Sequence, residues 1–456
     1  MDFRENNQVE FLPSGQSSYE VRWRLLQNAQ SSIHLVTFSF MKDGTTKKLF
    51  DLLKEKAKSG VKIKILYDEI VNRTTFVGKW IKDLEENGIE TFGYNNLFDG
   101  WSIHKSEGRP LKQVMAIVKL KLKQHFHEKY FIVDNEHLVI GGINWGDKYA
   151  YGGVRPKAWR DTDIYITGEL VQDVQLQFLK DFEMQQAWKI QKKNPKSRYP
   201  QFAISYLPIY KNNQNIIDKY SSFFRNNNDT LNSAGKIKIL YKAHKPYDEN
   251  ELNLTNFFLE KIKNAKKRIF WGCHGIRPPR IYAEYLAEAV KRGVRVVLIT
   301  NSQKSSRTLM VSGLLGWMYW ECTKYFKYIV EHGIEVYEWQ KPGAFHSKSL
   351  VIDDDFVSVG SYNIANGSAF HHSESNIVVQ DEHFCEKVYN QFLIDLQDCK
   401  KVDSANFKFP RVNAFDRILP ERVKMIRADL LTESIKKDIE LGNLKDAPFY
   451  EFIDIS

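Results

Sequence analysis

One motif occurs in both halves of this chain, and it constrains the fold more than any other feature. It spans residues 127–144 and again residues 346–363. In each copy Asp follows His by seven residues, Gly follows Asp by another seven, and Asn lies three further on. An apolar run leads up to each Asp, Tyr130–Val133 and Ser349–Ile352, as is typical of a buried strand. The duplication predicts two similar halves.

A cation stands beside each motif histidine. Alternate residues of a strand share one face, so His127 and Lys129 point into one pocket, and His346 and Lys348 do the same. An imidazole next to a fixed ammonium group suits an anionic substrate.

An amide closes each copy of the motif. Asn144 and Asn363 follow a second short apolar run and a glycine, which lets the backbone approach a ligand while the amide donates to an oxygen. Two half-sites together supply paired His, Lys and Asn. That set can attack, protonate and neutralise a phosphodiester without a metal, so we expect no metal and no cofactor.

These residues resemble the paired HxKxxxxD signature of the phospholipase D superfamily, and more narrowly the bacterial cardiolipin synthases. The resemblance extends to residues 141–147 and 159–162 and covers roughly residues 8 to 400. It implies an α/β fold of two pseudo-twofold-related α/β/α sandwich halves that form one active site between them. It also implies phosphodiester transfer through a covalent phosphohistidine.

The resemblance assigns unlike roles to the two histidines. His127 would be the nucleophile, and His346 the general acid and then the general base, although the sequence leaves this order open. Each imidazole needs a carboxylate to fix its tautomer, and Asp161 and Glu374 stand at the family's position for this role. The neighbouring Asp163 is expected to be an exposed acid at a strand start.

The remaining motif residues divide into two groups. Asp134 and Asp353 end their strands and are expected to hold the motif together. Gly142 replaces the serine of the second copy, Ser361, which leaves the first half one hydroxyl poorer near the phosphate. The other histidines receive no role. Four side chains are expected to neutralise charge on the phosphoryl oxygens: Lys129, Lys348, Asn144 and Asn363.

Helix, glycine and strand alternate in both halves, as in residues 50–66 and 285–299. Charge and proline rise between residues 189 and 201, where helical periodicity stops. We therefore expect a first phospholipase D-like half at 1–190, a linker at 191–203, a second half at 204–400 and a short helical C-terminal extension at 401–456.

Composition limits the kinds of binding partner and the cell compartment that we expect for this protein. The net charge of +10 favours a polyanionic partner such as an anionic membrane surface or a nucleic acid. The four cysteines show no metal-ligand spacing and are expected to be reduced and mostly buried. The chain start lacks a Sec-type signal pattern, and the longest apolar stretch is too short to span a bilayer. We expect a cytoplasmic or peripheral membrane protein, with signal-independent secretion left open, although many cardiolipin synthases carry N-terminal membrane helices.

Two stretches bear on the substrate class. Basic and apolar residues alternate between positions 105 and 129, which suits either a two-faced element with a solvated side or docking on anionic lipid headgroups. Aromatic residues flank leucines at positions 314–320, where a core helix is favoured over an interfacial contact.

The leading interpretation is phosphatidyl transfer from a glycerophospholipid to an alcohol such as phosphatidylglycerol, by a chain that can act as a monomer because it carries both half-sites. A phospholipase D hydrolase that releases phosphatidic acid is the near alternative, with export as an effector left open. A nuclease of the same superfamily and a catalytically inactive membrane-binding protein are less favoured, because no nucleic-acid module is found and both motifs are intact.

Overall fold

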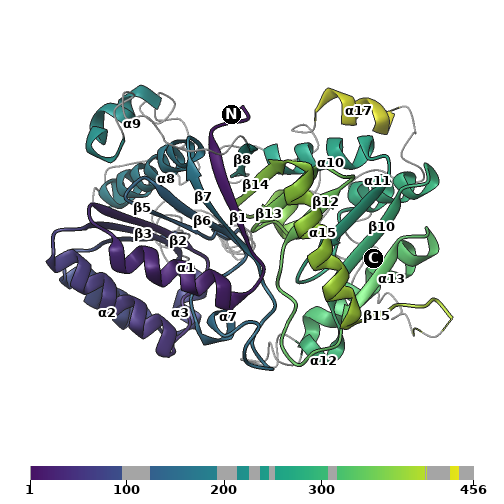
Figure 1. Ribbon diagram of the computed structural model, residues 1–456, viewed down its shortest axis with the longest axis horizontal. Helices are drawn as coiled ribbons and strands as arrows, with labels where there is room; N and C mark the ends of the chain where they lie inside the picture. The colour runs from purple at the N-terminus through teal and green to yellow at the C-terminus, as the bar shows by residue number, and fades with distance from the viewer. Residues whose placement is uncertain are drawn as a thin grey trace, which may run out of the picture.

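The computed structural model describes residues 2–94, 124–192, 213–224, 237–245, 252–306, 316–405, 407 and 432–440. Two mixed sheets lie side by side with helices on their faces (Figure 1). Much of the predicted linker and of the C-terminal extension, and most of the basic stretch 105–129, lie outside the described residues.

The first sheet has the strand order β1-β7-β6-β5-β2-β3-β4. Its strands are β1 Asn7–Leu12, β2 Ser32–Thr37, β3 Lys62–Asp68, β4 Glu90–Tyr94, β5 Tyr130–Val133, β6 His137–Gly141 and β7 Asp163–Gly168. The helices of this half are α1 Gly15–Asn28, α2 Gly44–Lys58, α3 Glu69–Thr74, α4 Gly78–Glu86, α7 Asp147–Ala150 and α8 Leu170–Lys192.

The second sheet has the order β15-β11-β10-β9-β12-β13-β14-β8. Its strands are β8 Lys238–His244, β9 Arg268–Gly272, β10 Arg295–Asn301, β11 Glu335–Trp339, β12 Ser349–Ile352, β13 Phe356–Gly360, β14 Glu374–Gln380 and β15 Cys399–Lys401. The remaining helices are α9 Asn213–Lys219, a 3₁₀ turn Ser221–Phe223, α10 Asn253–Asn264, α11 Arg280–Lys291, α12 Gln303–Ser306, α13 Gly316–Glu331, α14 Asn366–Phe370, α15 Glu382–Gln397 and α17 Glu433–Glu440.

The two sheets repeat one topology. In both, a hairpin (β5–β6 or β12–β13) pairs antiparallel on one side with the first of three parallel strands, β2-β3-β4 or β9-β10-β11. On its other side it pairs with an antiparallel strand, β7 or β14. An edge strand, β1 or β8, then pairs antiparallel with that strand. The second sheet adds only β15. The predicted α/β fold of two related halves is confirmed.

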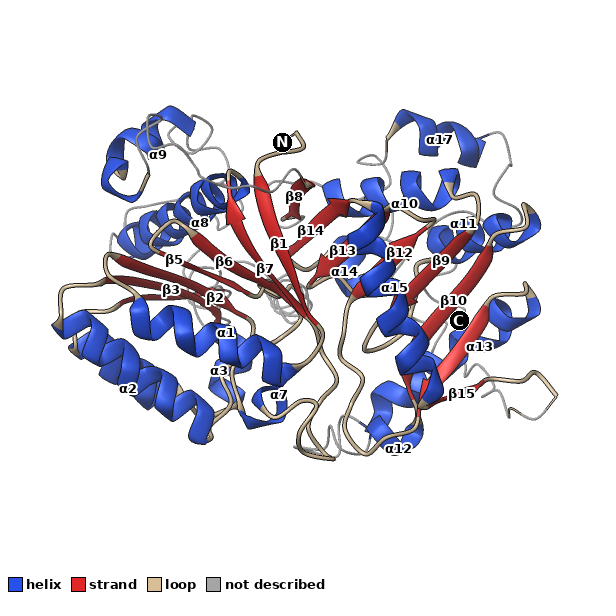
Figure 2. Cartoon of the chain, in the orientation of Figure 1, coloured by secondary structure: helices blue, strands red, loops and turns tan. Residues whose placement is uncertain are grey.

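Alternation along the central strands distributes side chains between separate cores. In β5, Tyr130 and Ile132 enter a cluster shared by both halves, while Phe131 and Val133 face α1 and α2. The shared cluster also contains side chains of α8, which packs on the first sheet, and of α15, which lies across the second sheet (Figure 2). Helices α10, α11 and α13 cover the outer face of the second sheet. The halves therefore have a common core.

Glycine ends several helices, as the helix, glycine and strand pattern predicts. Gly60 and Gly293 follow α2 and α11 with φ angles of +95° and +89°, a conformation that side chains with a Cβ disfavour. Each reversal feeds directly into a parallel strand, β3 or β10. All four cysteines are free thiols, and three are buried.

The C-terminal helix α17 packs on the second half. Ile435 is buried against the outer core, and the Asp438 carboxylate accepts from Tyr285 on α11 at 2.7 Å and pairs with Lys263 on α10.

In α13, the ring of Tyr319 is buried whereas Trp320 is 48% exposed. None of the described helices is long and apolar enough to cross a membrane.

A buried ion cluster joins the halves. Lys245, which follows β8 of the second half, donates to Glu128 at 2.5 Å and lies 2.8 Å from Asp181 on α8 of the first half. All three side chains are at most 3% exposed. Because both acids depend on this cation, its loss would leave buried negative charge uncompensated.

We expect Lys245→Met to lower the free energy of unfolding by about 3–5 kcal/mol, because a buried pair is broken from one side. Chemical denaturation checks this. The matched control is Lys238→Met at the start of β8, whose partner Glu5 is 64% exposed; its cost should stay below about 1 kcal/mol. Equal losses in the two variants would contradict the assignment.

Candidate active site

Backbone pairing between the halves places the two motif histidines. The amide of His127 donates to the carbonyl of Ser373 at 3.0 Å, and the amide of His346 donates to the carbonyl of Arg160 at 2.7 Å. Both contacts cross from one half to the other, and each ends one residue before a candidate carboxylate. The chain segment that carries each histidine is therefore aligned by the opposite half.

The carboxylates are exchanged between the halves. His127 Nδ1 lies 3.0 Å from both oxygens of Glu374, and His346 Nδ1 lies 2.5 Å from Asp161 Oδ2. Each imidazole thus meets the acid of the other half and not that of its own. An ionised carboxylate can only accept a hydrogen bond, so Nδ1 carries the hydrogen and Nε2 is left as the nucleophilic or proton-transferring atom.

Burial keeps both rings neutral at rest. Desolvation lowers the pKa of His127 to about 3 and depresses the pKa of His346 well below its usual value, with nearby lysine charge adding to the effect. Both residues are under 10% exposed. A neutral imidazole has the free lone pair that attack requires.

The two carboxylates have unlike surroundings. Glu374 accepts from the hydroxyls of Ser361 and Ser368 as well as from His127. Burial raises its pKa, but its interactions with His127 and His372 outweigh the burial, and its pKa lies well below the usual value. Burial raises the pKa of Asp161 to about 6, and its backbone donor is the amide of Thr162 at 2.8 Å. Glu374 is therefore the more firmly ionised acid.

Gly142 accounts for part of this difference. A Cβ at Gly142 would lie 2.2 Å from Asp161 Oδ1, so the missing side chain gives the shorter acid room to approach. In the second copy Ser361 fills the matching place and donates to Glu374. The hydroxyl of Ser361 also bonds the Ser375 backbone, and that this hydroxyl lies near the bound phosphate stays a prediction.

The lysines lie beside the histidines. Lys129 and Lys348 are each 1% exposed and donate to the carbonyl of the histidine two residues earlier. Burial, together for Lys129 with repulsion from Lys348, lowers their pKa values to about 7 and about 8. The site therefore contains two ammonium groups, one beside each histidine, that lose their protons more readily than an exposed lysine does.

The asparagines are held by loops that follow the central strands. Asn144 Oδ1 accepts from the amide of Ser39 at 3.1 Å, and its Nδ2 donates to the Tyr149 hydroxyl at 2.9 Å. Asn363 Oδ1 accepts from the amide of His274 at 3.4 Å. These contacts turn the amide oxygens toward backbone and leave further Nδ2 hydrogens as donors.

The motif aspartates make backbone contacts. Asp134 accepts from the amides of Gln30, Ser31 and Ser32 at 2.7 to 2.9 Å, and these bonds lower its pKa. Asp353 accepts from the amides of residues 266–268, and both acids have φ of +54°. Each carboxylate ties the motif hairpin to the start of the neighbouring strand, β2 or β9.

Asp163 corrects one expectation. It is fully buried, and not an exposed acid, because it pairs with the buried guanidinium of Arg22 at 2.8 Å and accepts from Ser18. The sequence offered no local sign of this pairing, since Arg22 lies on α1, far away in the chain.

Two histidines without a predicted role also lie at the site. The His372 ring centroid is 5.5 Å from that of His127, and the His274 centroid is 5.1 Å from that of His346. His372 stands two residues before Glu374, where the first half has Trp159 before Asp161. The spacing of two residues to Glu374 places His372 near that carboxylate, but only the contact between the halves brings it to His127.

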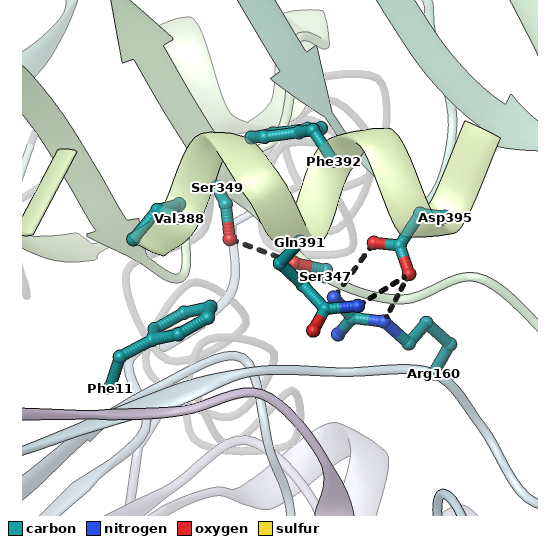
Figure 3. Close-up of a pocket in the computed structure, with 8 residues that line it drawn as sticks. All are labelled: Phe11, Arg160, Ser347, Ser349, Val388, Gln391, Phe392 and Asp395. Carbon is teal, nitrogen blue, oxygen red and sulfur yellow. Dashed lines mark hydrogen bonds and ion pairs between the residues drawn. The ribbon is translucent and has the colours of Figure 1, made fainter. Parts of the chain in front are cut away.

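A small pocket lies where the two halves meet, and its lining includes Phe11 and Arg160 of the first half and Ser347 and Asp395 of the second (Figure 3). Arg160 bonds both oxygens of Asp395 on α15, at 2.8 and 2.7 Å. Ser347 bonds Thr162 at 2.6 Å. The lining residues Arg160 and Ser347 are chain neighbours of Asp161 and His346, so this pocket supports the catalytic groups and does not contain them.

We expect Asp395→Ala to lower the free energy of unfolding by about 3 kcal/mol, because the Arg160 charge, 13% exposed, loses its partner. Denaturant titration measures it. Asp398→Ala removes an acid paired with the 57% exposed Lys341 near the end of the same helix and should cost less than about 1 kcal/mol. A smaller effect at Asp395 than at Asp398 would refute the prediction.

Comparison with known proteins narrows the class that the duplicated fold and paired His–Lys site define. A family model described as "Cardiolipin synthase, PLD-like domain" matches residues 23–183 and 258–396, more than half of the chain. The chain therefore belongs to this family of phospholipase D-like proteins, as its motifs predicted. The predicted class of enzyme, a phosphatidyl-transferring member of the phospholipase D superfamily, is confirmed.

Individual relatives support this family assignment. Cardiolipin synthase 1 of Staphylococcus epidermidis is 26% identical over 87% of this chain and 69% of its own length. The major cardiolipin synthase of Bacillus subtilis is 27% identical over 88% of this chain and 71% of its own length. A crystal structure of phosphatidylserine synthase from Haemophilus influenzae shares the fold, with a TM-score of 0.63, 16% identity and 97% coverage of both chains.

Proposed function

We propose that this protein transfers a phosphatidyl group from a glycerophospholipid to an alcohol, with phosphatidylglycerol as the acceptor, and thereby makes cardiolipin. The observation that carries the proposal is the pair of crossed hydrogen bonds, His127 to Glu374 and His346 to Asp161. They hold the Nδ1 hydrogen of each imidazole and leave Nε2 of His127 available for attack and Nε2 of His346 available for proton transfer. Family membership favours transfer over the hydrolase and nuclease alternatives.

His127 is the nucleophile in this proposal. Attack through Nε2 on phosphorus creates a positively charged phosphoimidazole ring and expels the first alcohol. Glu374 suits this ring because it is the firmly ionised carboxylate of the two, and its negative charge balances the positive charge that develops.

His346 is the general acid and base. When the anionic phosphodiester binds, Nε2 of His346 takes up a proton, and the resulting imidazolium pairs with Asp161. It gives this proton to the departing alcohol, becomes neutral, and then takes the proton of the incoming alcohol as that oxygen attacks the phosphohistidine. Asp161, with its pKa raised to about 6, stabilises the imidazolium without holding it permanently charged. The two steps return both histidines to their starting protonation states.

Lys129 and Lys348 neutralise charge that grows on the phosphoryl oxygens, and the amides of Asn144 and Asn363 donate to the same oxygens. Removing one such donor should cost roughly 10² to 10³ in rate. Asp134 and Asp353 hold the hairpins and do not contact substrate, in keeping with their backbone partners.

The lipid substrate implies work at a membrane surface. Net charge of +10 supports peripheral binding to anionic lipid. Both half-sites belong to one chain, which supports a monomer as the active unit.

The first test is product analysis by mass spectrometry after incubation with phosphatidylglycerol vesicles in the presence of chelator. We expect cardiolipin and glycerol, lost in His127→Ala and His346→Ala. Phosphatidic acid as the main product would make the protein a hydrolase, because water and alcohol compete for one intermediate. Absence of any lipid turnover would refute the proposal and direct the search to oligonucleotides.

A second test separates the roles of the histidines. With a phosphatidyl ester of p-nitrophenol, whose departure needs no acid, His346→Ala should release one equivalent of nitrophenol in a burst and then stall as phosphatidyl-enzyme. His127→Ala should give no burst, because the nucleophile is gone. The reverse pattern would exchange the two roles.

The pH profile of kcat/KM should be bell-shaped. The rate should fall as the pH drops below about 6, where Asp161 takes up a proton, and as it rises through about 7 to 8, where Lys129 and Lys348 lose theirs. Asp161→Asn should lower the rate by about 10² to 10⁴ and abolish the acid limb. An unchanged acid limb in Asp161→Asn would contradict the assignment.

A further inference from the structure

Three side chains at the first half-site converge closely enough to share one ion. One nitrogen from each of His127 and His372 and one oxygen of Glu374 lie within 4.8 Å of one another. The measured pairs are 3.0 Å from His127 Nδ1 to Glu374 and 3.6 Å from His372 Nδ1 to Glu374 Oε1. Ligands of a tetrahedral zinc ion with bonds of about 2.0 Å lie about 3.3 Å apart, so both separations fit.

His372 is available for coordination. Its Nδ1 is buried and has no hydrogen-bond partner within the described part of the chain. The backbone amide of His372 donates to the carbonyl of Gly367 at 2.7 Å, which fixes the position of the residue. Gly367 also leaves room for the imidazole ring, since a Cβ there would lie 2.5 Å from His372 Cε1.

The other half-site lacks this third ligand. At the position of the repeat that matches His372 stands Trp159, whose ring centroid lies 5.2 Å from that of His346. Among the described residues, the set around His127 is the one group of three potential ligands that comes this close. An ion would therefore bind next to His127 and not next to His346.

We propose that His127, His372 and Glu374 form a binding site for a borderline divalent cation of the zinc class, and that its occupation switches the enzyme off. Two imidazoles and one carboxylate are a ligand set that Zn²⁺ or Co²⁺ prefers over Mg²⁺ or Ca²⁺. The binding step is independent of the proposed function, whereas the inhibition rests on it.

Coordination explains the inhibition. A cation bound at His127 Nδ1 displaces the proton that Nδ1 shares with Glu374, and that proton moves to Nε2 of the same ring. Nε2 then carries hydrogen and has no lone pair for phosphorus. The ion also takes the negative charge of Glu374, which no longer stabilises a phosphoimidazole ring. The positive charges of Lys129 and Lys348 repel the metal ion and weaken its binding, so a chelator should be able to remove it.

Binding is tested by titrating the full-length protein with Co²⁺ and recording its visible absorption, followed by competition with Zn²⁺. We expect one site per chain with the intense absorption of four-coordinate cobalt. His372→Phe keeps a ring and removes its nitrogens, and it should weaken binding by more than about 10-fold, since even the loss of groups behind metal ligands costs that much. His127→Ala should do the same, and the matched control His371→Phe should bind as the original protein does.

Inhibition is tested in the cardiolipin assay. Zn²⁺ should abolish turnover reversibly, with EDTA restoring it, and His372→Phe should need more than about 10-fold more Zn²⁺ for half-inhibition of its own activity. Absence of a cobalt site, or equal binding by His372→Phe and the original protein, would overturn the proposal. A chain that binds cobalt at these residues but turns over no lipid would refute the proposed function and leave the metal site standing.

Discussion

The exchange of carboxylates between the halves is the interaction on which the rest of this structure depends. Glu374 reaches back to His127, and Asp161 reaches forward to His346, so neither half holds a finished catalytic group. The common core between the sheets, the Lys245 ion cluster and the Arg160–Asp395 pair all act across the same junction. Their shared consequence is that folding of the two halves onto each other assembles both imidazole–carboxylate pairs at once.

Near-symmetry is useful here because it is incomplete. Two identical imidazoles would titrate as a coupled pair and could not take opposite roles unless their surroundings differ. The differences are small in chemistry: Gly142 stands where the second copy has Ser361, and Trp159 stands where it has His372. They give Glu374 additional donors and leave Asp161 with a pKa raised to about 6. One half-site is thereby suited to a covalent intermediate and the other to moving a proton.

Much of the architecture could be predicted because the duplicated motif carries its own register. The runs Tyr130–Val133 and Ser349–Ile352 form strands with the predicted bounds, since fully apolar stretches of this length are buried on both faces. The predictions that failed concern single side chains whose partners lie far away in sequence. Asp163, which was expected to be exposed, is buried because Arg22 comes to it from α1. His372 was passed over because its closeness to His127 depends on contact between the halves.

The sequence by itself determined which residues can do chemistry, because strand alternation and the spacing from His to Asn place them on one face and at one edge of a sheet whatever surrounds them. It also determined that there are two such edges. Only the tertiary structure decided which acid serves which imidazole, how strongly each acid is ionised and which further histidines stand nearby. Those properties arise from contacts between residues more than a hundred positions apart and from burial, and neither is written in local spacing.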